Sequence, residues 1–177
     1  MKTVKEIGKI LTKNTSTRGK KVVFFISSFI ATGCFVGKIK YAPGTFGSLF
    51  AIIFCPYYIL LPQVWQIIIL CSLLALGTIS THIYLIKIND PTKDPKEVVI
   101  DEIIAIFLMT WMCQIAVPAG EMKWQHFLSI FVLFRFFDVL KPYPICWVDK
   151  HIHGAKGIIL DDILASIAGW LCFCVSA

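Results

Sequence analysis

Acidic residues stand in apolar surroundings at three separate places in this sequence. Asp101 and Glu102 lie between Val-Val-Ile and Ile-Ile, Asp138 lies between Phe-Phe and Val-Leu, and Asp161 and Asp162 lie between Ile-Ile-Leu and Ile-Leu. A carboxylate in an apolar environment is costly unless a cation or hydrogen-bond donors accompany it. Three such clusters in one chain of 177 residues therefore predict a shared functional site.

Each cluster also has a purely structural explanation. Asp161 and Asp162 would suit the first turn of a helix, where the helix dipole favours negative charge. Arg135 and Asp138 are spaced i,i+3 and would neutralise each other on one helix face. The acidic pair at 101–102 is expected about two turns after the start of its helix, so the dipole explains that pair poorly.

Clustered carboxylates point to a particular ligand chemistry. Several carboxylates in a low-dielectric site raise one another's pKa unless a cation joins them. Oxygen ligands with few histidines nearby favour Mg²⁺, which also contacts substrate phosphate. Arg135 and Lys141 add positive charge in the same segment, and both side-chain types bind phosphate oxygens. The combination predicts a site that handles phosphoryl groups.

A turn rich in small residues, at positions 40–48, is a second candidate for phosphate binding. It precedes an apolar segment, and free backbone N–H groups at a helix N-terminus bind anions. Gly44 and Gly47 would let a ligand approach the backbone, while Thr45 or Ser48 would add a hydroxyl. A plain turn with Thr45 as the helix N-cap explains the same residues.

The composition indicates a membrane protein. Hydrophobic residues make up 57% of the chain and charged residues 16%, and the mean hydropathy is +0.76. Soluble domains carry about 25% charged residues. Positions 41–86 contain no Asp, Glu, Lys or Arg. We expect an all-α fold, a small polytopic helical membrane protein with about five or six helices.

The expected helices follow from the apolar segments and from their proline and glycine boundaries. A capping box predicts that one helix begins at Asp94, with Pro95 in its first position and Glu97 in its third. The apolar segment at 22–37 is shorter than the roughly 20 residues that span a bilayer, so it is expected to be interfacial, re-entrant or covered by protein. The helix that Asp94 caps is expected to run from 95 to 116, and the other helices are expected at residues 46–61, 64–86, 124–140 and 157–175.

The net charge of +6 is concentrated at the N-terminus. Residues 1–21 contain seven basic residues and one acidic residue, and the rest of the chain is formally neutral. A basic arm next to an apolar segment predicts a cytoplasmic tail that touches anionic lipid. A signal peptide is disfavoured because no clear cleavage site follows, and nucleic acid is not expected as a partner. We therefore divide the chain into a basic arm, 1–21, and a single helical membrane domain, 22–177.

Four segments together resemble the phosphatidylglycerophosphatase A family of bacterial membrane lipid phosphatases. They are YAPGTFGSL at 41–49, DPKEVVIDE at 94–102, RFFDVLKPYPI at 135–145 and GAKGIILDDILA at 154–165. They occur in the family's order and span positions 38–170. Two positions depart from the family pattern: Ala105 replaces a frequent glycine, and Ala155-Lys156 replaces a glycine-rich step.

The resemblance implies an activity and a location. The implied reaction is Mg²⁺-dependent hydrolysis of the terminal phosphate of phosphatidylglycerophosphate, which gives phosphatidylglycerol and inorganic phosphate. The implied location is the bacterial cytoplasmic (inner) membrane, with several spans and a cytoplasmic N-terminus. The partner is then an anionic phospholipid in the membrane, and the oligomeric state is left open.

On this basis each candidate residue receives a hypothetical role. Asp138 is a further ligand or the catalytic base, and direct attack by water is preferred over an aspartyl-phosphate. The Mg²⁺ ligands and water-positioning groups are Asp101, Glu102, Asp161 and Asp162, and the phosphate-binding groups are Arg135, Lys141, Thr45 and the backbone of Gly44, Gly47 and Ser48.

Two alternatives stay open. A phosphatase for another lipid phosphate, such as phosphatidic acid or a prenyl phosphate, would need the same site. A small cation or proton transporter would use the acidic residues as an ion path at the middle of the bilayer, without a phosphate-binding Arg and Lys.

Overall fold

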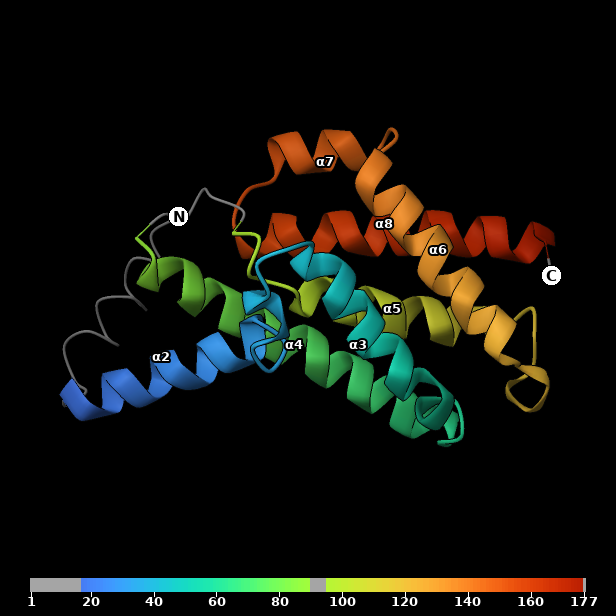
Figure 1. The fold of residues 1–177 in the computed structure, drawn as a ribbon, viewed down its shortest axis with the longest axis horizontal. Coiled ribbons are helices and arrows are strands. Elements are labelled where there is room, and N and C mark those ends of the chain that lie inside the picture. The colour runs from blue at the N-terminus through green and yellow to red at the C-terminus, as the bar shows by residue number, and fades with distance from the viewer. Residues whose placement is uncertain (1–16, 90–94, 177) are drawn as a thin grey trace.

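The computed structural model describes residues 17–89 and 95–176, which form helices and connecting turns without any strand. The all-helical prediction is confirmed, with seven α-helices among these described residues (Figure 1). They are α2 Thr17–Ala31, α3 Pro43–Tyr58, α4 Gln63–Lys87, α5 Ile100–Cys113, α6 Trp124–Leu140, α7 Ile145–His151 and α8 Ala155–Ser176, with short 3-10 helices η1 Val36–Lys38 and η2 Ala119–Glu121.

Helix α5 is the centre of the bundle. It packs against α3, α4, α6 and α8, and α6 crosses obliquely over α8 (Figure 1). Its buried side chains include Ile104, Ile106 and Met109, each at most 1% exposed. A helix that is apolar on most sides belongs in a core. Any acidic group on α5 is therefore held among packed helices.

Within residues 17–89 and 95–176, two helices are long and apolar enough, by length and composition, to cross a membrane: α4 over its 25 residues and α8 over Ala155–Val175. Helix α4 exposes large apolar side chains such as Trp65, Leu76 and Ile79. Exposed apolar side chains in this number on one helix are characteristic of contact with lipid or with a partner. The fold therefore agrees with the composition in indicating a membrane protein.

Helix α5 begins at Ile100, so the expected start at Pro95 is wrong. The proposed cap, Asp94, lies outside the described residues. Residues 96–97 form a turn instead, and the Val99 N–H donates to the Ala31 carbonyl oxygen of α2 over 3.0 Å. This tertiary contact fixes the backbone ahead of the helix. Asp101 and Glu102 consequently lie in the first turn of α5.

Helix α8 begins two residues earlier than expected, at Ala155. Asp161 and Asp162 therefore lie in the second turn, so a first-turn dipole effect does not account for them. The positions of the two acidic pairs are therefore the reverse of those expected: the pair at 101–102 lies in a first turn, and the pair at 161–162 lies in a second turn. The explanation from the helix dipole suits Asp101 and Glu102.

Two further differences concern the segments that flank the bundle. The segment expected as one apolar unit at 22–37 contains only the C-terminal part of α2, which begins at Thr17 and ends at Ala31. A turn with left-handed backbone at Gly33, Cys34 and Phe35 follows. The polar link expected before α8 contains part of the short helix α7. Helix α6 has the predicted bounds, Trp124–Leu140.

Candidate active site

The three acidic clusters converge on one pocket of about 230 Å³. The N-terminus of α3, the turn before α5 and the first turn of α5 contribute to it, together with the C-terminal part of α6 and the second turn of α8. Its lining contains five carboxylates and three basic side chains. The lining residues are Ala42, Pro43, Gly44, Lys96, Val98, Asp101, Glu102, Arg135, Asp138, Lys141, Ile158, Asp161 and Asp162.

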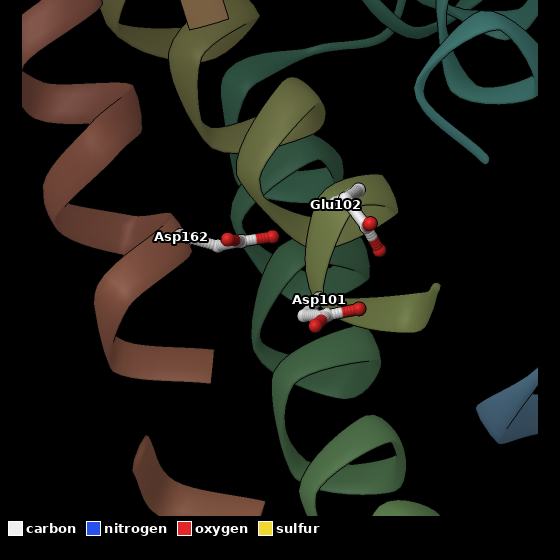
Figure 2. Close-up of side chains that lie close together, drawn as sticks. All are labelled: Asp101, Glu102 and Asp162. Carbon is white, nitrogen blue, oxygen red and sulfur yellow. The ribbon is translucent and has the colours of Figure 1, made fainter. Parts of the chain in front are cut away.

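Three of these carboxylates are close enough to share one cation. Asp101, Glu102 and Asp162 each offer an oxygen, and these oxygens lie within 4.8 Å of one another. Asp162 projects from α8 toward the first turn of α5, which carries the other two (Figure 2). Asp101 is 7% exposed and Asp162 is 4% exposed.

Two buried oxygens of this group have no hydrogen-bond donor among the described residues: Glu102 Oε2 and Asp162 Oδ2. A buried acceptor without a donor is costly, and such atoms in a native protein usually mark a ligand or ion site. Carboxylate oxygens are the ligands that Mg²⁺ prefers. The donor set therefore fits a hard divalent cation.

Arg135 joins α6 to this group. Its guanidinium lies 2.6 Å from Asp138 Oδ2 and 3.9 Å from Glu102 Oε1. Burial raises the pKa of Glu102, and the charge of Asp138 raises it further, while a hydrogen bond with Asp101 and the charge of Arg135 lower it. Glu102 is thus held where its charged form needs positive charge nearby.

Lys141, the C-cap residue of α6, bridges two helices. Its Nζ donates to Asp161 Oδ2 of α8 over 2.6 Å and to Asp149 Oδ1 of α7 over 2.7 Å. Burial lowers the pKa of Lys141, but the two carboxylates outweigh it and the net shift is upward. The role of Asp149 was not foreseen, because helix α7 was not.

The backbone around the pocket is tightly constrained. A Cβ atom at Gly44 would overlap Glu102 Oε1 and come within 3.1 Å of the Arg135 guanidinium. Ala42 and Lys141 have left-handed backbone, with φ of 44° and 43°, which costs roughly 1–2 kcal/mol per non-glycine residue. Two of the five non-glycine residues with positive φ in the described structure thus line this pocket, and strained backbone is common at functional sites.

Three predicted phosphate-binding residues of α3 are absent from the lining: Thr45, Gly47 and Ser48. Ser48 is buried, and its hydroxyl donates to the Gly44 carbonyl oxygen over 2.8 Å. Gly47 packs against Val99, where a Cβ would come within 2.8 Å. In this structure Gly47 and Ser48 therefore make contacts within the protein, and the lining of the pocket on α3 comes from Pro43 and Gly44.

One basic residue in the lining, Lys96, was missed by the sequence analysis. The sequence pattern places it inside the expected helix start at 94–97 and assigns it no role in the site. The signal was its position five residues before Asp101, but that spacing has meaning only once residues 95–99 are known to form a turn.

The sequence is similar to one known protein family and to named proteins from bacteria. The family model described as phosphatidylglycerophosphatase A matches residues 29–177. Phosphatidylglycerophosphatase A of Escherichia coli (strain K12) is 36% identical over 149 residues, covering 81% of this chain and 80% of the relative. The protein of the same name from Haemophilus influenzae is 35% identical over 141 residues, covering 78% and 80%.

A further relative carries a different name. A Bacteroides thetaiotaomicron protein with the provisional name phosphatidylinositol-3-phosphatase is 30% identical over 154 residues, covering 86% of this chain and 94% of the relative. No solved structure matches the chain.

Proposed function

The chain belongs to the phosphatidylglycerophosphatase A family, and on that premise we propose that it hydrolyses the terminal phosphate of phosphatidylglycerophosphate, giving phosphatidylglycerol and inorganic phosphate. Family membership makes it a phosphatase that acts on a phosphoric monoester. One observation carries the proposal to this pocket: five carboxylates and three basic side chains from separate elements line the same small cavity.

We propose that Mg²⁺ is the cofactor. Asp101, Glu102 and Asp162 would hold it, because their oxygens lie within 4.8 Å of one another and two buried oxygens lack donors. When bound, the ion would neutralise charge on the phosphate and on the departing oxygen. Asp161 belongs to the same lining, but it accepts a hydrogen bond from Lys141. We therefore propose that Asp161 positions the ammonium group of Lys141 rather than Mg²⁺.

The residues of the chain supply binding and proton transfer. Arg135 has five N–H donors, so it can hold Asp138 and still donate to phosphate oxygens. Asp138 is the proposed base: it takes a proton from the attacking water as the water oxygen bonds to phosphorus. The bond from phosphorus to the glycerol oxygen breaks, and that oxygen takes up the proton that Asp138 holds and leaves as an alcohol, which returns Asp138 to its carboxylate form.

We also propose an arrangement in the membrane. The chain would cross the bacterial inner membrane several times with its N-terminus in the cytoplasm, supported by two helices of sufficient length and by the basic residues of 1–21. Each well-placed basic residue contributes about 1 kcal/mol of attraction to an anionic surface. Removing residues 1–18 should weaken binding to liposomes that contain anionic lipid, and unchanged binding would remove this role from the arm.

The activity is tested by measuring phosphate release from phosphatidylglycerophosphate by the detergent-purified protein. We expect release with Mg²⁺, none with EDTA, and recovery when Mg²⁺ is added back. Phosphatidic acid, a prenyl phosphate and phosphatidylinositol 3-phosphate serve as competing substrates, the last because of the name of one relative. Faster release from one of these would transfer the proposal to that lipid.

A transporter is the remaining alternative. It requires that none of the four lipids release phosphate, and that proteoliposomes containing the protein conduct cations or protons. This pair of results would overturn the phosphatase proposal for this chain.

A further inference from the structure

The three basic side chains of the pocket differ in what they already contact. Arg135 lies near two carboxylates, and Lys141 donates to two others. Lys96 has no carboxylate within ion-pair distance in the described part of the chain, although it lines the same cavity. We infer that Lys96 binds a phosphate group of the lipid substrate, an inference that rests on the proposed function.

Electrostatics explains why such a residue is needed. The lining holds more carboxylates than cations, and the substrate brings further negative charge on its monoester phosphate. Positive charge that is already paired with the chain's own carboxylates attracts an incoming anion less than unpaired charge does. Lys96 is the basic group of the lining whose charge stays available in the described structure.

The backbone that carries Lys96 is held from both sides. The Tyr84 hydroxyl of α4 donates to Glu97 Oε2 over 2.6 Å, so the neighbouring carboxylate already has a partner. The Val99 N–H donates to the Ala31 carbonyl oxygen over 3.0 Å. Lys96 thus lies on a segment that contacts α4 through the Glu97 side chain and α2 through the Val99 backbone.

Two further contacts hold the turn that carries Lys96. The Val98 N–H donates to the Pro95 carbonyl oxygen over 2.9 Å and closes the turn. The Glu97 carbonyl lies so close to Gly37 that a Cβ there would overlap it. The turn is therefore fixed against η1, while the Lys96 side chain itself is exposed and able to reach a ligand.

The side-chain type suits the role. Lysine offers a compact charge on a flexible stem, which can follow a phosphate that moves as the lipid enters. A charged hydrogen bond to a substrate contributes enough affinity to change KM by about tenfold or more. Because the contact forms on binding, KM should change much more than kcat.

The test compares Lys96→Met, which keeps the stem but removes the charge, with Lys96→Arg, which keeps the charge. Lys156→Met is the matched control, because Lys156 is an exposed lysine near the start of α8 that does not line the pocket. We measure kcat and KM for phosphatidylglycerophosphate, inhibition by inorganic phosphate, and calorimetric binding of inorganic phosphate.

We expect Lys96→Met to raise KM at least about tenfold while kcat changes less than about threefold, with recovery in Lys96→Arg and no change in Lys156→Met. If inhibition by inorganic phosphate weakens in parallel, Lys96 binds the monoester phosphate. If that inhibition is unchanged while KM rises, Lys96 binds the phosphodiester of the lipid. Both results support the inference.

An unchanged KM in Lys96→Met, or an equal rise in Lys156→Met, would overturn it. So would a fall in kcat that accompanies a lower unfolding temperature, since that reports a structural role. If the wild-type protein releases no phosphate, the proposed function fails by itself. Calorimetry then still tests Lys96 as a ligand of the monoester phosphate: in that role the Lys96→Met variant must bind inorganic phosphate more weakly than the wild type, and equal binding would overturn that role.

Discussion

The two ends of helix α5 both carry buried polar side chains, but they differ in whether these groups have hydrogen-bond partners within the protein. The first turn holds Asp101 and Glu102 in the carboxylate pocket, and the C-cap residue is Gln114. At the C-terminal end the polar groups find partners within the protein. In the pocket at the first turn, Glu102 Oε2 and Asp162 Oδ2, the latter from α8, have no donor among the described residues.

The C-terminal cluster is organised around Gln66 of α4, which is 1% exposed. Its Nε2 donates to the Leu61 carbonyl oxygen over 2.8 Å, and Gln114 Nε2 donates to its Oε1 over 2.8 Å. The Tyr58 hydroxyl donates to the Gln66 carbonyl oxygen over 3.0 Å. A buried polar network whose members have partners fixes the packing of helices.

The pocket at the other end of α5 contains an arrangement that is unfavourable without a ligand. Carboxylates of like charge are gathered there, and Glu102 Oε2 and Asp162 Oδ2 lack donors. The comparison teaches that burial of polar groups does not by itself identify function. The distinguishing feature is whether the partners come from the chain or must come from outside it.

The largest effect is expected for Asp162→Asn. The substitution replaces an oxygen of the proposed Mg²⁺ group by an amide nitrogen, which cannot bind a hard cation. Phosphate release should fall by roughly 10²–10³-fold or more, the loss typical of removing one electrostatic contact to the transition state. The measurement is kcat/KM for phosphatidylglycerophosphate at saturating Mg²⁺.

The same variant also tests the stability side of the comparison. Neutralising one of several gathered carboxylates relieves repulsion, so without Mg²⁺ the unfolding temperature should stay equal or rise. A gain of 1 kcal/mol corresponds to about 2–4 °C for a chain of this size. A variant that is both inactive and less stable in EDTA would place Asp162 in a structural network like that of Gln66.

A smaller loss of activity is expected for Gly44→Ala. Alanine favours a helix over glycine by about 1 kcal/mol, but here its Cβ would overlap Glu102 Oε1. Glu102 must move, so kcat/KM should fall by about 10–100-fold, in line with the sensitivity of preorganised sites to small displacements. Gly120→Ala is the control, because a Cβ there meets nothing within 4 Å.

Stability rather than activity should change in Gln66→Ala. Removing the amide leaves Gln114 Nε2 and the Leu61 carbonyl oxygen without this partner, at a cost of about 1–3 kcal/mol in the free energy of unfolding. The protein that remains folded should keep its kcat/KM within about twofold, since the cluster lies at the far end of α5 from the acidic residues. A large loss of activity in the folded protein would show that the Gln66 cluster contributes to activity, and the proposed division of roles between the two ends of α5 would be wrong.

The sequence indicated the pocket better than it indicated the backbone that forms it. Charged residues in apolar surroundings carry their own signal, so Asp101, Asp138 and Asp162 were named before their contact was known. The start of α5 was missed because capping rules are local, whereas contacts from Ala31 and Gly37 decide where that helix begins.

Other elements were missed for related reasons. Helix α7 has seven residues and little apolar periodicity, so it read as part of a polar link. Lys96 was overlooked because charged residues in a turn are ordinary until the fold places them beside a cavity. Helix α6 was predicted with the correct bounds, because a continuous apolar segment between polar boundaries determines it.

The smallest change in free energy is expected for Asp149→Asn, which tests whether α7 contributes to the carboxylate pocket. Asp149 is 41% exposed in its side chain, and its partner Lys141 keeps a second contact, 2.6 Å from Asp161. Exposed ion pairs contribute about 0.2–1 kcal/mol, so kcat/KM should fall by no more than about fivefold. Asp161→Asn should cost more, because it removes the buried partner of Lys141. Equal losses in the two variants would mean that α7 holds Lys141 as firmly as α8 does, and the pocket would then extend to a fifth helix.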